Sequence, residues 1–166
     1  MEIERQFLVE TLPLLPDTYE ELQQGYVSLE PEIRIRRIGN SQFLLTVKRG
    51  VGLVREEWET NISRQEYENL AARLYPETKM IEKRRYRVEL KAGHIAELHV
   101  HGGHLAGFNY VEVEFSTVEE AKAFVPPYWF DREVTEDARF SYGTLAREDG
   151  MELVRRLLNH GQEQPD

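Results

Sequence analysis

Pairs of like-charged residues that are separated by one residue recur along this chain. The pairs are Glu2/Glu4, Arg34/Arg36, Glu57/Glu59, Lys83/Arg85 and Glu112/Glu114. This spacing places both charges on one face of a β-strand and residues such as Ile3, Ile35 and Val113 on the other. Like charges that share a dry environment are costly unless opposite charges or a ligand meet them. The charged faces therefore need either water or one another, and this need constrains the fold more than any other feature.

Strand-like segments are numerous, and helices interrupt them at two places. The alternation predicts strands near residues 2–9, 23–28, 32–39, 42–49, 53–62, 80–91, 95–101 and 109–116. Capping boxes at 63–66 and 117–120 predict helices that begin there and end near Leu74 and before Pro126. A third helix is expected from about Asp149 to Asn159, where Leu153, Leu157 and Leu158 follow helical spacing.

Eight strands with short connections predict an all-β-dominated α+β protein, built on an eight-stranded antiparallel β-barrel with helices packed outside. A two-sheet sandwich is the alternative. In a sandwich the charged faces would be solvated, whereas in a barrel they would line the interior. The repetition of paired like charges favours the barrel, because a solvated face usually mixes charges with Ser and Thr.

An interior that brings acidic and basic strands together needs a ligand that satisfies both. Clustered carboxylates bind a hard divalent cation such as Mg²⁺ or Mn²⁺. Clustered Arg and Lys side chains bind phosphate oxygens, and Arg can do so bidentately. A polyphosphate that carries a divalent metal ion would meet both surfaces at once.

The overall charge and composition limit the partners. The net charge of −9 disfavours binding to a nucleic-acid polymer, which needs a basic face. The chain has no cysteine, which excludes disulfides and thiolate metal sites, and it has no apolar segment of membrane-spanning length. We therefore expect a cytoplasmic protein, monomeric or homodimeric, that acts on a small molecule and has no membrane partner.

The charged strands resemble those of the CYTH superfamily, the triphosphate tunnel metalloenzymes. The stretch from Glu2 to Val9 is similar to the E-x-E-x-K signature of that family. Further similar stretches follow in the family's order at 24–26, 34–36, 45–48, 55–59, 82–86, 111–115 and 133–140. The resemblance implies a tunnel domain over residues 1–146. The residues that follow predict a C-terminal helix at 147–160 packed on the barrel and a flexible tail at 161–166.

The resemblance also implies an activity, the metal-dependent hydrolysis of a triphosphate inside the tunnel with Mg²⁺ or Mn²⁺. The substrate would be inorganic tripolyphosphate or an organic triphosphate. Two alternatives stay open: an adenylate cyclase of the same family, and a non-catalytic module that binds polyphosphates or nucleotides.

Site roles carried over by the resemblance fall into three groups. The metal ligands would be Glu2, Glu4, Glu57, Glu59, Glu112 and Glu114. The phosphate chain would be bound by Arg34, Arg36, Lys48, Arg55, Lys83, Arg85 and Arg139. The catalytic set would be Gln6, Glu59, Glu97 and Lys83, with Glu59 or Glu97 accepting the proton of the attacking water.

Three residues depart from the family pattern. Gln6 stands in place of the signature Lys, His99 in place of the usual Asp, and Tyr142 in place of a common Asn. Loss of a cation at position 6 is expected to weaken hydrolysis by about 100-fold or more, or to redirect it to another substrate. His99 is expected to face the tunnel, where it could contact metal or phosphate or carry a proton, and His101 to lie near the rim.

Two further patterns could each indicate a binding site, but we favour a structural explanation for both. His99 and His101 could form a metal-binding pair of the cupin type, but no Glu follows at the usual short spacing. The aromatic segment at 126–130 could be a partner surface, but we expect it to plug one end of the barrel.

Overall fold

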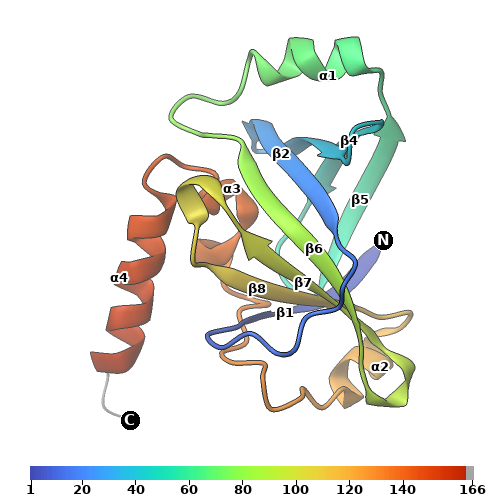
Figure 1. The fold of residues 1–166 in the computed structure, drawn as a ribbon, viewed down its shortest axis with the longest axis vertical. Coiled ribbons are helices and arrows are strands. Elements are labelled where there is room, and N and C mark those ends of the chain that lie inside the picture. Colours follow the sequence, from blue (N-terminus) through green and yellow to red (C-terminus); the bar gives the residue numbers. More distant parts are fainter. Residues whose placement is uncertain (164–166) are drawn as a thin grey trace.

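The structure, a computed structural model, describes residues 1–163 and the burial of side chains as far as residue 159. Its eight strands are β1 (Glu2–Leu8), β2 (Glu20–Leu29), β3 (Glu32–Ile38), β4 (Gln42–Arg49), β5 (Val54–Asn61), β6 (Ile81–Glu89), β7 (Ile95–His101) and β8 (Asn109–Glu114). They form a closed barrel in the order β1-β5-β4-β3-β2-β6-β7-β8, in which every pairing is antiparallel (Figure 1). The prediction of a barrel is confirmed, and the sandwich alternative is wrong.

Four α-helices accompany the barrel within residues 1–163. They are α1 (Arg64–Ala71), α2 (Val118–Ala123), α3 (Tyr142–Leu145) and α4 (Gly150–Glu163), with 3₁₀ turns at Lys91–Gly93, Gly103–Leu105 and Ala138–Phe140. The capping box that predicted α1 is present, because the Ser63 hydroxyl accepts from the backbone of Glu66 and the Glu66 carboxylate accepts from the backbone of Ser63. None of the helices within the described residues is long and apolar enough to cross a membrane.

Two helix boundaries differ from the predicted ones. Helix α1 ends at Ala71, before Leu74. Helix α4 begins at Gly150 and continues to Glu163, so residues 161–163 are helical where a tail was predicted. The remainder of the predicted tail, residues 164–166, lies outside the described residues.

Cross-strand register brings the paired charges to the inside of the barrel. Glu4 lies opposite Glu114 and Gln6 opposite Glu112 where β1 meets β8. Residues of opposite parity, such as Phe7, pack outside. Alternation along each strand therefore sorts charged side chains inward and apolar side chains outward.

Two apolar layers cover the outer face. Helix α1 packs on β3 and β4 through a cluster of Tyr67, Ile35 and Phe43. Helix α2 and the segment that follows it pack on β1, β7 and β8, where the rings of Phe7 and Phe130 lie 4.9 Å apart. Phe7 projects outward from β1, so the 126–130 segment covers the outer wall, and the prediction that it plugs a barrel end was wrong.

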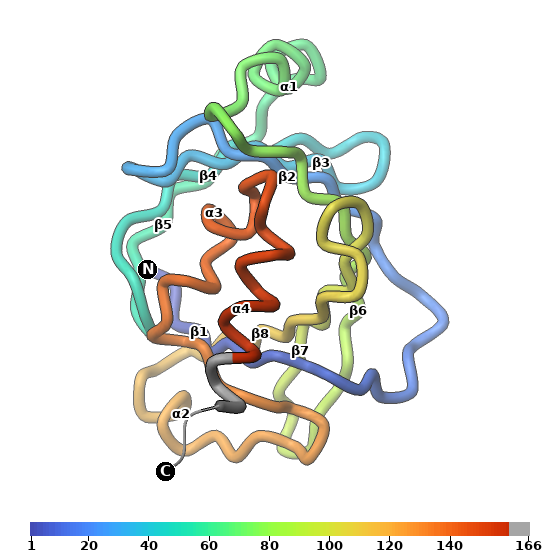
Figure 2. Tube along the Cα trace, turned by 90° about the vertical axis from the view of Figure 1, so that its left-hand side faces the viewer, coloured from blue at the N-terminus to red at the C-terminus, as the bar shows by residue number. Residues whose placement is uncertain are grey.

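The C-terminal segment occupies one end of the barrel instead. Figure 2 shows α3 and α4 lying across the ring of strands. Tyr142, Leu145 and Val154 from these helices join one core cluster with inward-facing Tyr26 and Tyr110. Of the three leucines whose spacing predicted an apolar helix face against the barrel, Leu157 and Leu158 pack against this cluster, at the barrel end and not on its outer wall. The end of the interior near Tyr142 is therefore walled by aromatic side chains.

Candidate active site inside the barrel

The interior of the barrel holds a cavity of about 960 Å³. Most of the site residues predicted from the sequence line it. These are Glu2, Glu4, Gln6, Arg34, Arg36, Lys48, Arg55, Glu57, Glu59, Arg85, Glu97, Glu112 and Glu114. Nearby His99 and Tyr142, two of the departures from the family pattern, line the same cavity. Because these side chains come from seven strands, the closed sheet is what brings them together.

Two predicted residues lie elsewhere. Lys83 faces inward and is buried, but it lines a second cavity of about 500 Å³ together with His101. Its ammonium lies 4.1 Å from the centre of the Tyr142 ring, which stands at the end of the main cavity. Arg139 lies outside the lining of both cavities, because it is largely exposed and binds Asp137 through two nitrogens at 2.7 and 2.8 Å.

Lys48 links two carboxyl groups at one side of the cavity. Its ammonium donates to Glu2 at 3.0 Å and lies 3.8 Å from Glu57. A hydrogen bond with Glu2, together with burial, raises the pKa of Glu57 to about 7. Burial opposes ionisation of Glu2, but the hydrogen bond from Glu57 and the charge of Lys48 outweigh it and lower the pKa of Glu2. The pair therefore holds a proton that an incoming cation can displace.

Glu4 is buried deeper than Glu2. Burial and the nearby charge of Glu112 raise its pKa well above the ordinary value. The Gln6 amide donates to Glu4 at 2.7 Å and supplies a hydrogen bond without a charge. A carboxyl group in this position ionises readily only when a cation is close, so Glu4 is suited to a metal ion or a neighbouring ammonium.

The basic side of the cavity has unpartnered donors. Arg34 is buried and Arg36 is partly buried, and the Nε atoms of both are buried without a hydrogen-bond partner within the described part of the chain. Burial and the charges of Arg34 and Arg85 lower the pKa of Arg36 to about 10. Thr46 connects this side to the acidic one, because it donates to Glu59 at 2.8 Å and accepts from Arg34 at 3.4 Å. An anion with several oxygens would satisfy the free donors and offset the repulsion.

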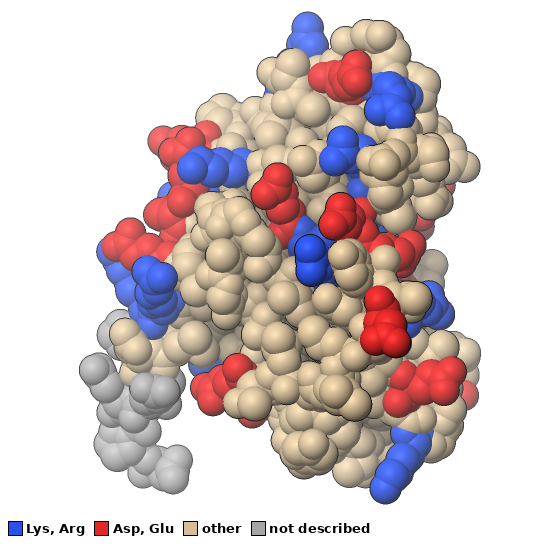
Figure 3. All heavy atoms as spheres, viewed as in Figure 1, with Lys and Arg blue, Asp and Glu red and all other residues tan. Residues whose placement is uncertain are grey.

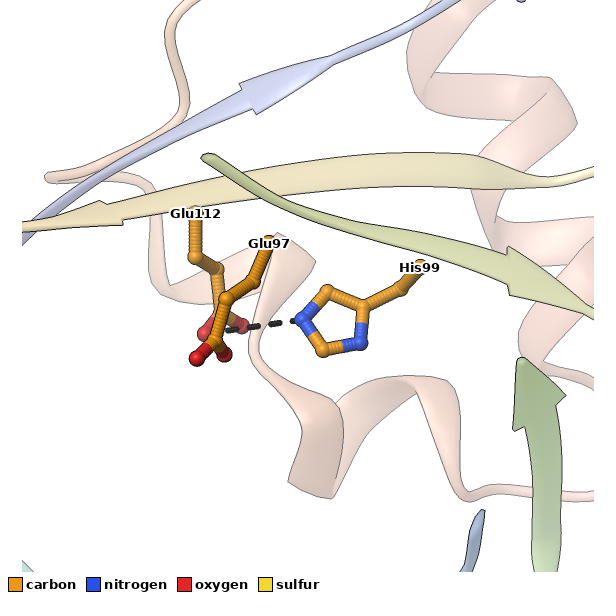
Figure 4. A group of neighbouring side chains, drawn as sticks. All are labelled: Glu97, His99 and Glu112. Carbon is orange, nitrogen blue, oxygen red and sulfur yellow. Dashed lines mark ion pairs between the residues drawn. The ribbon is translucent and has the colours of Figure 1, made fainter. Parts of the chain in front are cut away.

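A cluster of two carboxylates and one imidazole lies on β7 and β8. Glu97 and His99 share the inward face of β7, and Glu112 lies directly opposite Glu97 in the register. One ligand atom from each of the three lies within 4.8 Å of the others, and His99 Nε2 is 3.7 Å from a Glu112 oxygen (Figure 4). Burial and the charge of Lys83 lower the pKa of His99 to about 4, so the ring is neutral near pH 7.

The donor set of this cluster fits a divalent cation. Neutral imidazole nitrogen and carboxylate oxygens are common ligands for such ions. The predicted ligand set included Glu112, while His99 was predicted only to face the tunnel and contact metal or phosphate or carry a proton, and Glu97 was given a different role. The alternation of Glu97 and His99 in the sequence was the available signal, but only the register of β7 against β8 places them beside Glu112.

A closed barrel with a charged interior defines a tunnel-type protein, in which strands on all sides enclose a polar cavity. A CYTH domain profile matches residues 1–125, and the chain belongs to the CYTH domain family. The resemblance seen in the sequence is therefore confirmed.

Relatives in this family cover nearly the whole chain. An inorganic triphosphatase of Nitrosomonas europaea is 41% identical over 150 residues, covering 87% of this chain and 96% of that protein. An inorganic triphosphatase of Acetivibrio thermocellus is 31% identical, covering 88% of this chain and 93% of that protein. A crystal structure of an inorganic triphosphatase matches with a TM-score of 0.65 at 38% identity, covering 88% of this chain and 94% of that one.

Proposed function

We propose that this protein hydrolyses a triphosphate in its barrel, with inorganic tripolyphosphate as the substrate and Mg²⁺ or Mn²⁺ as the metal. The observation that carries the proposal is a cavity that joins guanidinium groups with buried, unpartnered Nε donors to clustered carboxyl groups. The naming of two relatives as inorganic triphosphatases supports the choice of substrate.

The basic residues would bind and orient the phosphate chain. Arg34 and Arg36 lie on the inward face of β3, and Arg85 on β6 lines the same cavity. Their donors would stabilise the charge that shifts to the phosphoryl oxygens as the anhydride bond breaks. Lys48 would serve at the end where it meets Glu2 and Glu57.

The acidic residues would serve the metal and the water. Glu97, His99 and Glu112, whose ligand atoms lie close together, would hold one cation, and Glu4 is close enough to Glu112 to be affected by its charge. The bound metal would neutralise phosphate charge and lower the pKa of water. Glu59, held by Thr46 and facing the cavity, remains our choice of proton acceptor for the attacking water.

The surface supports a small substrate over a nucleic-acid polymer. Figure 3 shows acidic and basic side chains interspersed over one face of the molecule. The net charge of −9 adds to this, because a polyanion would be repelled at long range. The cationic groups that could bind phosphate are gathered inside the barrel, where a small molecule can enter.

Phosphate release across a substrate panel tests the proposal. The panel is tripolyphosphate, thiamine triphosphate and ATP, each with Mg²⁺, Mn²⁺ or EDTA. We expect metal-dependent release that is fastest from tripolyphosphate and absent with EDTA. Arg156→Gln, which removes one exposed charge on α4, should leave the rate unchanged. Cyclic AMP formed from ATP would favour the cyclase alternative, and binding of tripolyphosphate without release would favour the non-catalytic module.

A further inference from the structure

The cluster of Glu97, His99 and Glu112 has a mixed set of ligand atoms, in contrast to the carboxylates around it. We propose that this site prefers a transition-metal cation such as Mn²⁺, Co²⁺ or Zn²⁺ over Mg²⁺, and that His99 sets the preference. The inference rests on the metal dependence proposed above, and it adds which metal the site selects and which residue is responsible.

The first support is the rigidity of the cluster. Glu97 and His99 are two positions apart on β7, and the register pairs Glu97 with Glu112 on β8. Figure 4 shows the carboxyl groups of Glu97 and Glu112 side by side, with the His99 ring directed toward them. Ligands that come from paired strands are held in place before the ion arrives, so their chemistry controls which ion binds well.

The second support is an unsatisfied imidazole. His99 is 2% exposed, and neither ring nitrogen has a hydrogen-bond partner within the described residues. Its Nε2 lies 3.7 Å from the nearest Glu112 oxygen, which is too long for a hydrogen bond. Two atoms that share one ion at about 2.1 Å each lie roughly 3 to 4 Å apart, so this separation suits an ion between them.

The surroundings of His99 leave few other partners for its ring. The rings of Tyr110 and Tyr142 lie 6.3 and 6.1 Å from it, and the ring of His101 lies 6.5 Å away. His101 itself is engaged through Nδ1 with the Phe108 carbonyl at 2.8 Å. A buried polar group without a partner costs free energy, and a cation shared with Glu112 would satisfy it.

The third support is ligand preference. Mg²⁺ favours carboxylate, carbonyl and water oxygens, whereas Mn²⁺, Co²⁺ and Zn²⁺ also accept imidazole nitrogen well. Compared with an Asp at the same position, His99 gives the site one negative charge and one oxygen ligand fewer. Both changes weaken the binding of Mg²⁺ more than that of a transition metal. The preference should therefore reverse toward Mg²⁺ when His99 becomes Asp.

The test is metal binding by the full chain without a histidine tag. Calorimetric titrations with Mg²⁺, Mn²⁺, Co²⁺ and Zn²⁺ are compared for the wild type, His99→Asp and the control His94→Gln. His94 is a suitable control because it packs against Phe115 and Phe124 outside the barrel. We expect His99→Asp to lower the Co²⁺-to-Mg²⁺ affinity ratio by at least about 10-fold, and His94→Gln to leave it unchanged.

A spectroscopic readout tests the ligand directly and does not depend on measured affinities. Pulsed electron paramagnetic resonance of Mn²⁺ bound to the wild type should show coupling to an imidazole nitrogen, and His99→Asp should lack it. An unchanged affinity ratio in a folded His99→Asp variant, or bound Mn²⁺ without nitrogen coupling, would overturn the proposal. Because neither readout uses phosphate release, a protein that selects the metal but hydrolyses nothing would refute the proposed function and leave this inference standing.

Discussion

At the scale of single residues, Gln6 is the most informative position in the cavity. It lies on the inward face of β1, opposite Glu112 in the register, and its amide donates to Glu4 at 2.7 Å. A neutral amide can orient Glu4 but cannot offset phosphate charge. With Gln at position 6, the acidic side of the cavity therefore has one positive charge fewer than it would have with the Lys of the family signature.

The change Gln6→Lys should raise tripolyphosphate turnover. The new ammonium would lie beside Glu4 and near the substrate, where negative charge increases in the transition state, so kcat should rise by about 10-fold or more while KM changes little. Steady-state kinetics on tripolyphosphate measures both constants. The matched control is Gln65→Lys on the exposed face of α1, which should match the wild type. Identical kinetics for Gln6→Lys and the wild type would remove Gln6 from the site.

Arg36 illustrates how a binding residue can reduce stability. Burial and its neighbours Arg34 and Arg85 lower its pKa, which means that the folded protein disfavours its charge when no anion is bound. Arg36→Gln should therefore lower kcat/KM by about 100-fold while the melting temperature stays the same or rises. Steady-state kinetics and thermal unfolding of the same preparation show whether kcat/KM falls while the melting temperature does not. A fall in both activity and melting temperature would mean that Arg36 acts mainly as a structural residue.

At the scale of elements, one side chain ties β1 to the layers outside it. Arg5 projects outward from β1 and donates to the Ala121 and Phe124 carbonyls, both at 2.9 Å, at the end of α2. The same guanidinium binds the Glu133 carboxylate through two nitrogens at 2.7 and 2.9 Å. These contacts hold α2 and the segment around residue 133 against the barrel.

Replacing Arg5 by Met should destabilise the protein by about 1–3 kcal/mol, because two buried carbonyls and one carboxylate lose their donor. Arg156→Met, which breaks an exposed pair with Glu152 on α4, should cost no more than about 0.5 kcal/mol. Urea unfolding of both variants gives the comparison. Equal costs for the two changes would show that the Arg5 contacts contribute no more than a surface ion pair.

The same contact predicts a dependence of stability on pH. The hydrogen bond from Arg5 lowers the pKa of Glu133 below its ordinary value in the folded state. A lowered carboxyl pKa adds stability above the unfolded pKa, and that stability is lost as the pH falls through the folded pKa. Wild type should thus exceed Glu133→Gln in stability at pH 6, with the difference shrinking below about pH 4. A difference that stays constant from pH 6 to pH 3 would contradict this contribution.

The elements show what the sequence could and could not predict. Charge alternation gave the inward face correctly for the strands that carry paired like charges, because parity along a strand follows directly from the residue order. Depth in the barrel does not follow from parity, and Lys83 accordingly lies beyond the main cavity, beside Tyr142. The grouping of His99 with Glu112 needed the register between two strands, which the sequence leaves open. The aromatic run at 126–130 suited either an end or an outer wall, and only packing against Phe7 decided it.

At the scale of the whole molecule, the barrel encloses charges that repel one another until ligands bind. Glu4 faces the charge of Glu112 on one side, and Arg36 faces Arg34 and Arg85 on the other. Any ligand that binds the folded state alone stabilises it in proportion to the logarithm of its concentration. The metal and the triphosphate should therefore act on the stability of the entire fold.

Divalent metal and tripolyphosphate should each raise the melting temperature. At a metal concentration 100 times its dissociation constant, the expected gain is about 2.7 kcal/mol. Glu4→Gln combined with Glu112→Gln should reduce the shift caused by Mn²⁺. Loss of the Glu4 charge relieves repulsion, but the folded protein lowers the pKa of Glu112 through His99 and Lys83, so the metal-free double variant should be no more stable than the wild type. Thermal unfolding with and without Mn²⁺ measures both quantities. A full Mn²⁺ shift in the double variant would place the metal elsewhere.

The central claim is that the interior of the barrel is the place where metal and triphosphate meet. A crystal structure of the protein with Mn²⁺ and a non-hydrolysable triphosphate analogue, with the ion located by its anomalous scattering, tests it most directly. We predict Mn²⁺ bound by Glu97, His99 and Glu112, with the phosphate chain against Arg34 and Arg36. An analogue bound on the outer surface, or Mn²⁺ bound away from these carboxylates with the interior unchanged, would contradict the account.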